Sequence, residues 1–205
     1  MRQFRVRGSG FTLIELVIVM AVVFVLVVLA VPSFQTYLEK ARVREAADNI
    51  SNLLAKARAE SIKLNLPVSV KAVSSSAGAV WCVGALQATA PAAWAQRPIS
   101  ATACDCDSAI ATCLVADEQL AVTSTTTTTR KPTIAITGFD YSYSPRLGGI
   151  SANGSNASFL STSGSQLDIT SSSGRFKVSV VVSPLGQARV CQPAGVAPIL
   201  GYRPC

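Results

Sequence analysis

Residues 8–32 read GSGFTLIELVIVMAVVFVLVVLAVP, and this segment supplies much of the hydrophobicity of the chain. From Leu16 to Val31, sixteen consecutive residues are apolar. Residues 11–31 would span about 31 Å as an α-helix, which matches the hydrocarbon thickness of a bilayer. The stretch is therefore predicted to be a membrane-spanning helix, with the Arg-rich residues before it on the cytoplasmic side.

One carboxylate interrupts the start of this segment. Placing Glu15 inside a bilayer-spanning helix costs roughly 2.5–3.5 kcal/mol at the centre, so such a group usually has a partner or a function. A secretory signal peptide also begins with basic and then apolar residues, but the run here ends in LAVPSF, a weak cleavage site. An ordinary single-span anchor explains the length and leaves Glu15 unexplained.

The run GFTLIE, from Gly10 to Glu15, resembles the class III signal of type IV prepilins, pseudopilins and related filament subunits. The resemblance implies that a membrane prepilin peptidase cuts after Gly10, that Phe11 becomes the N-methylated terminus, and that the apolar helix stays on the mature protein. It also implies that Glu15 neutralises the α-amino group of Phe11 in a neighbouring subunit. In an apolar filament core, either charge alone would be costly.

A helical period continues beyond the apolar run. Small or apolar residues recur at spacings of three and four, namely Val43, Ala47, Ile50, Leu54, Ala57, Ser61 and Leu64. We expect Pro32 to bend the helix rather than end it, and Pro67 to stop it. The prediction is a leader over residues 1–10 and one long helix over 11–65, of which 11–31 form the membrane and filament-core stem.

Residues 66–205 are predicted to form a β-rich head, because short runs of Val, Ile and Thr alternate there with Gly, Ser and Pro. The candidate strands are 68–73, 79–84, 119–124, 132–137, 157–162, 166–170, 175–183 and 187–191. Residues 87–113 are interpreted as an insertion loop, and the Thr-rich run 123–129 fits a strand edge, a linker or a glycosylated patch. The fold class is therefore α+β, with a long N-terminal helix packed on a C-terminal antiparallel sheet.

The chain has six cysteines and no histidine. An even count in an exported chain indicates disulfides, and the easiest pair is Cys191 with Cys205, which would fasten the tail. The pairing of the others, Cys82, Cys104, Cys106 and Cys113, stays open. Zinc is the rival interpretation for the middle group, but the C-x-C spacing is unlike a C-x2-C knuckle, so no metal and no cofactor are expected.

Residues 49–70 and 174–191, with the closing run 201–205, resemble the GspH/FimT group of minor pilins and pseudopilins. The resemblance implies a low-copy subunit at or near a filament tip that helps to prime assembly. Its implied partners are other major and minor pilins, the prepilin peptidase and the inner-membrane assembly platform. The implied location is the bacterial inner membrane, with one span and a periplasmic head, and later an extracellular pilus or a periplasmic pseudopilus. A pseudopilin of a type II secretion system, which has the same stem, is the alternative.

Some members of that group bind DNA during natural transformation through a C-terminal Gly-Arg-x-Arg motif. Here the equivalent stretch keeps Gly186 and Arg189 but has Gln187 in place of the first arginine, so one phosphate contact is lost. Arg175, Lys177 and Arg203 are the other cations expected to grip the phosphates of double-stranded DNA without reading its sequence. A solvated basic surface is the other interpretation of the same residues, since the formal net charge is only +7.

No catalytic site is expected from this sequence. It has no histidine, no well-spaced metal cluster, no nucleophile motif and no Gly-rich phosphate loop after a strand. A structural subunit is therefore predicted rather than an enzyme.

Overall fold

In the computed structural model, the placed residues are 12–75, 80–88, 104, 106, 112–124, 132–137, 139–152 and 165–205. The predicted strand 157–162, the Thr-rich run from residue 125 onward and most of the predicted loop 87–113 lie outside them. The chain divides into two compact units, Met1–Leu38 and Glu39–Cys205. The second unit is the head, and one helix runs through both.

The helix α1 (Leu13–Leu64) is a single element of 52 residues. It continues through Pro32, because a long helix tolerates the loss of one backbone hydrogen bond. It ends at Leu64, and the next residue, Asn65, has a φ of 52°, in the left-handed region that Asn adopts more readily than most residues. Pro67, the expected stop, follows two residues later.

The second half of α1 buries the predicted stripe. Val43, Ala47, Ile50, Leu54, Ala57 and Ser61 are all fully buried, and Leu64 packs against the same core. Ala46 and Leu53 widen this face. Because the stripe follows the helical period, the head half of α1 is the central element of the hydrophobic core.

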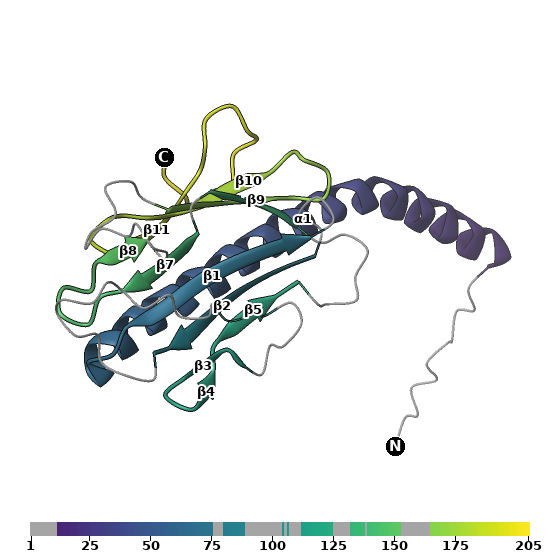
Figure 1. The fold of residues 1–205 in the computed structure, drawn as a ribbon. Helices are drawn as coiled ribbons and strands as arrows, with labels where there is room; N and C mark the ends of the chain where they lie inside the picture. The colour runs from purple at the N-terminus through teal and green to yellow at the C-terminus, as the bar shows by residue number, and fades with distance from the viewer. Residues whose placement is uncertain are drawn as a thin grey trace, which may run out of the picture. The chain divides into compact units, whose positions relative to one another are not determined.

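Eleven strands are assigned in the described residues. Strands β1 and β2 run alongside the second half of α1 (Figure 1). They are β1 (Val68–Ser75), β2 (Val80–Gln87), β3 (Leu114–Val115), β4 (Glu118–Gln119), β5 (Ala121–Thr123), β6 (Thr133–Thr137), β7 (Asp140–Tyr143), β8 (Ile150–Ala152), β9 (Ser165–Thr170), β10 (Lys177–Val182) and β11 (Ala188–Cys191). A five-stranded sheet has the order β5-β2-β1-β7-β8, a four-stranded sheet has the order β11-β10-β9-β6, and β3 pairs with β4. Every strand pair is antiparallel, so the predicted α+β class is confirmed.

The structure corrects the predicted strands in two places. The predicted strand 119–124 is wrong as one element, because Leu120 separates β4 from β5. The short strands β3, β7 and β8 were not predicted. In β7 the aromatic residues Tyr141 and Tyr143 alternate with polar ones, and the strand is only four residues long before Pro145. It is held between β1 and β8, so tertiary pairing rather than a long apolar run defines it.

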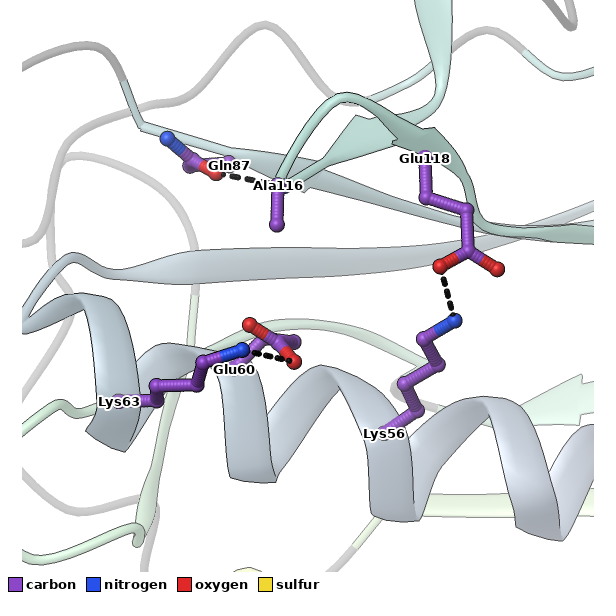
Figure 2. Close-up of polar contacts among 6 residues, drawn as sticks. All are labelled: Lys56, Glu60, Lys63, Gln87, Ala116 and Glu118. Atoms are coloured by element: carbon purple, nitrogen blue, oxygen red, sulfur yellow. Dashed lines mark hydrogen bonds and ion pairs between the residues drawn. The ribbon is translucent and has the colours of Figure 1, made fainter.

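The β3–β4 hairpin is fastened to α1 and to β2 by polar contacts (Figure 2). Its loop residues Ala116 and Asp117 have φ values of 52° and 61°, as in a two-residue type I′ turn. Lys56 of α1 pairs with Glu118 at 2.5 Å. The amide of Ala116 donates to Gln87 Oε1 at 2.8 Å. The hairpin is thus positioned although each of its strands has only two residues.

All six cysteines are paired, as Cys82–Cys106, Cys104–Cys113 and Cys191–Cys205. The last pair is the one that the sequence favours. A Cβ atom on Gly84 of β2 would lie 2.5 Å from Cys104 Sγ and 2.9 Å from Cys113 Sγ. The first two bonds are therefore packed directly onto β2 at a position where only glycine leaves room.

Candidate functional site

The predicted processing junction between Gly10 and Phe11 lies outside the described residues, and the residues directly after it form a helix N-terminus. Thr12 and Glu15 bond each other reciprocally there. The Thr12 amide and the Thr12 hydroxyl both donate to Glu15 Oε2 at 3.0 Å, and the Glu15 amide donates to Thr12 Oγ1 at 3.3 Å. This is a capping box, in which two unpaired amides at a helix start are satisfied.

Thr12 is the residue that the sequence analysis missed. The pattern Thr-x-x-Glu before an apolar run signals a capping box, and it is present in residues 12–15. This capping box fixes the position of the Glu15 side chain. The Glu15 carboxylate is exposed and is held beside the first turn of α1, next to the predicted mature terminus.

The first half of α1 is long and apolar enough to cross a membrane, with a mean hydropathy of 3.3 over its best window. None of that window is buried inside the protein. The exposed apolar side chains include Leu16, Ile18, Met20, Phe24 and Leu26. An unburied helix of this composition is what a membrane anchor requires.

Two of the candidate DNA-binding cations share one face of the four-stranded sheet. In β10, Val178, Val180 and Val182 are buried toward the core, so Lys177 points to the opposite face. Arg189 of β11 is exposed, and it pairs with Val181, which lies on the same face as Lys177. Val181 lies four positions after Lys177 in β10, so the two cations lie about 13 Å apart along the strands.

The charge of Lys177 is already neutralised inside the protein. Lys177 Nζ lies 2.7 Å from Asp168 Oδ2, while Ser179 and Gln166 donate to Asp168 Oδ1 at 2.5 and 2.8 Å. Burial alone would raise the pKa of the Asp168 carboxyl. The hydrogen bonds from Lys177, Ser179 and Gln166, with the charge of Lys177, outweigh burial and lower this pKa below its ordinary value. Arg189 is the more available cation for an outside anion.

Arg175 and Arg203 are placed on other elements. Arg175 lies in the turn between β9 and β10, with its guanidinium carbon 5.6 Å from the centroid of the Phe176 ring. Arg203 belongs to the tail after β11, where its carbonyl accepts a hydrogen bond from the Gln192 amide at 2.8 Å. The cations among the candidate DNA-binding residues therefore do not lie together. Lys177 and Arg189 lie on a strand face, Arg175 lies in a turn, and Arg203 lies in the tail.

Gly186 has a packing reason to be glycine. It is buried, with a φ of +76°, and a Cβ atom there would lie 1.9 Å from the carbonyl oxygen of Gly148. The turn between β10 and β11 thus rests on the turn between β7 and β8. Gln187, beside it, lines a groove of about 540 Å³ with Arg58, Ile62 and small residues of α1. Packing within the head therefore accounts for Gly186 and Gln187 without a bound nucleic acid.

The zinc alternative is excluded for the cysteines, because Cys104, Cys106 and Cys113 are all held in disulfides. Within the described parts of the chain, no cluster of three or more His, Cys, Asp or Glu side chains is arranged to hold a metal ion.

Two family models match the chain. The one described as "Type II transport protein GspH" covers residues 46–190, and the one described as "Prokaryotic N-terminal methylation motif" covers residues 5–31. No solved structure matches the chain significantly. Members of these families are processed by a prepilin peptidase, assemble with other pilins or pseudopilins, and serve as structural subunits. A membrane-type helix with a methylation motif, joined to a head that the GspH model covers, means that this chain belongs to the GspH family of minor pilins and pseudopilins.

Proposed function

We propose that this protein is a minor pilin that is built into a type IV pilus at or near its tip and helps to prime assembly of the filament. The observation that carries the proposal is the combination of an N-terminal methylation motif and membrane-type stem with a GspH head in one chain. Before assembly the stem anchors the subunit in the inner membrane, with the head in the periplasm. The role is structural and not enzymatic.

In this proposal, the peptidase cleaves after Gly10 and Phe11 becomes the methylated N-terminus. Glu15 then meets the α-amino group of Phe11 on the neighbouring subunit. The capping box supports this role, because it holds the Glu15 carboxylate at the start of the helix rather than letting it swing along the apolar surface. A charge pair inside an apolar filament core compensates two groups that would each be costly alone.

Deletion of the gene in its host tests the proposal. We expect far fewer surface pili, restoration by the intact gene, and an epitope-tagged copy found at filament ends by immunogold microscopy. Uniform labelling along the filament would contradict the tip position. Normal pilus numbers in the deletion strain would contradict the priming role.

A second candidate is a pseudopilin of a type II secretion system, which the description of the matching family favours. The same deletion strain separates the two. Loss of secreted enzymes with normal pili would assign the chain to secretion, whereas loss of pili with normal secretion would assign it to the pilus.

Double-stranded DNA is a further partner that we propose for the outer face of the four-stranded sheet. Exposed Arg189 supports it, since a cation on a strand face can contact a phosphate without reading sequence. Lys177 contributes less, because Asp168 neutralises it. Gly186 and Gln187 shape the adjoining turn, while Arg175 and Arg203 would contact DNA only at the margins of this face.

Gel retardation of a duplex by the detergent-solubilised chain tests this partner. Arg189→Gln should weaken binding and reduce the slope of log affinity against log salt by about 1. Asp168→Asn should strengthen binding, because it releases Lys177. Lys63→Gln, which removes an exposed cation of α1, is the matched control and should change little. Absence of retardation at about 50 mM salt would remove DNA from the proposal.

A further inference from the structure

The boundary between the membrane-spanning segment and the head is marked by aromatic side chains. Residues 13–31 span about 28 Å as a helix, which fills the hydrocarbon core. Phe34 and Tyr37 follow, and they are 62% and 66% exposed. Tyrosine is enriched at the interface between a bilayer and water, because its ring is apolar and its hydroxyl is polar. Residues 32–38 therefore cover the depth of the headgroup layer, which adds about 5–8 Å on each side of the core.

A pair of cations lies at the first turn of the head, directly after this boundary. Lys40 Nζ is 5.0 Å from the centroid of the Phe176 ring, and the guanidinium carbon of Arg175 is 5.6 Å from the same centroid. Phe176 is buried, so its ring is a fixed support that brings the two charges together from α1 and from the β9–β10 turn.

Neither cation is neutralised by a carboxylate in the described part of the chain. Glu39, next to Lys40, makes no ion pair with either cation; its Oε2 accepts a hydrogen bond from the Ser173 hydroxyl at 2.5 Å, so one carboxylate lies against the same turn. This bond ties the β9–β10 turn to the same part of α1. Lys40 and Arg175 are thus held close together at the start of the head, and neither is in an ion pair with a described carboxylate.

The turn itself is small and polar. Residues 171–175 read SSSGR, and all of them except Ser171 are exposed. Gly174 has a φ of +74°, and a Cβ there would meet no atom within 4 Å. No large side chain therefore keeps this turn away from a flat surface, and the exposed Ser172 hydroxyl is a suitable donor to a phosphate oxygen.

We propose that Lys40, Arg175 and the β9–β10 turn form a surface that binds anionic phospholipid headgroups of the membrane in which α1 is anchored. The inference rests on membrane anchoring and holds equally for a pilus and for a secretion pseudopilus. Lys40 follows the membrane boundary so closely that lipid phosphates lie within the Debye length of about 8 Å, where a basic residue is attracted to an anionic bilayer. The contact steadies the head while the subunit awaits extraction into a filament.

Hydrogen exchange of the full chain in nanodiscs tests the surface. Peptides covering residues 39–44 and 171–176 should exchange several-fold more slowly in discs containing phosphatidylglycerol than in discs of phosphatidylcholine alone. Each of the substitutions Lys40→Gln and Arg175→Gln should lower the preference for the anionic disc about fivefold, and both together about 25-fold. Salt at about 1 M, where the Debye length is about 3 Å, should abolish the protection.

Lys63→Gln is the matched control, since it removes an exposed cation at the other end of the same helix and should leave the protection unchanged. Exchange in the buried strand β10 reports folding of every variant, so a misfolded protein is recognised.

Equal exchange of the turn in both kinds of disc would overturn the proposal. A short duplex that protects the turn in phosphatidylcholine discs, where anionic lipid gives none, would assign the surface to DNA instead. Failure of the chain to enter any disc would contradict the anchoring itself.

Discussion

Gly174 and Gly186 have nearly the same backbone conformation in very different surroundings. Their φ values are +74° and +76°, in the left-handed region that costs other residues about 1–2 kcal/mol. At Gly174 an added Cβ meets open space, whereas at Gly186 it meets the Gly148 carbonyl oxygen at 1.9 Å. The two positions therefore separate the cost of backbone conformation from the cost of a clash.

Substitution of each glycine by alanine measures these two costs. Gly174→Ala should lower the free energy of unfolding by about 1–2 kcal/mol, because only the conformation opposes it. Gly186→Ala should lower it by clearly more, because a backbone carbonyl cannot move aside as a flexible side chain would. Denaturant titration followed by tryptophan fluorescence gives both values, and an equal loss at the two sites would contradict the close approach of the two turns.

Asp168 makes the stability of the head depend on pH. The hydrogen bonds and the charge of Lys177 lower its pKa in the folded state below the unfolded value. A carboxyl of this kind contributes stability that is fully present above its unfolded pKa, about 3.9, and is lost as the pH falls through the folded pKa. Acid unfolding should therefore begin below about pH 4, and Asp168→Asn should flatten the loss of stability in that range. The same acid profile in the variant would contradict this assignment.

Among the secondary-structure elements, α1 is tied to two separate turns by one side chain. Arg58 Nε donates to the Gly148 carbonyl at 2.9 Å, and an Arg58 Nη atom donates to the Leu185 carbonyl at 3.2 Å. Gly148 lies in the β7–β8 turn and Leu185 in the β10–β11 turn, so the guanidinium links both sheets to the helix. The bond to Gly148 is partly buried and the bond to Leu185 is exposed. Hydrogen bonds from a charged group contribute about 1.5–3 kcal/mol, and we assign this contribution to the Gly148 bond.

Removal of this guanidinium should loosen both turns together. Arg58→Met keeps most of the aliphatic volume, and we expect it to lower the free energy of unfolding by about 2–3 kcal/mol and to speed hydrogen exchange in residues 145–149 and 183–187. Lys63→Met is the control, because Lys63 pairs with Glu60 at an exposed site and such pairs contribute about 0.5 kcal/mol or less. Faster exchange in one turn only would show that the two turns are held independently.

At the scale of the whole molecule, the sequence predicts well the elements whose apolar pattern repeats over many residues. The helix from Leu13 to Leu64 follows from the apolar run and from the buried stripe that begins at Val43, because each of these patterns repeats over many turns. The alternation in β10 likewise buries Val178 and Val180. Strong periodicity survives tertiary packing, since the core selects the same face at every turn.

Features that depend on partners distant in the sequence are less predictable. Strand β7 is defined by its neighbours β1 and β8, and the pairing of Cys82 with Cys106 is one of many that six cysteines allow. Neutralisation of Lys177 by Asp168 depends on strand register, which places β9 beside β10. The candidate cations could therefore be named from the sequence, but which of them remain available for an anion could not.

The filament assignment depends on Glu15, and the capping box provides a way to separate its two roles. Glu15→Ala removes both the helix cap and the carboxylate charge, whereas Glu15→Gln removes the charge and keeps a side chain that can complete the box with Thr12. If the charge neutralises the amino terminus of a neighbouring subunit, both variants should be processed normally and yet fail to enter filaments. Thr12→Ala, which weakens the cap by about 1 kcal/mol and leaves the charge, should still be incorporated.

Immunoblots of sheared filaments against whole-cell fractions measure incorporation, and mass spectrometry of the membrane-bound form checks processing. Normal incorporation of Glu15→Gln would leave Glu15 as a helix cap alone, because a neutral amide cannot compensate a buried ammonium group.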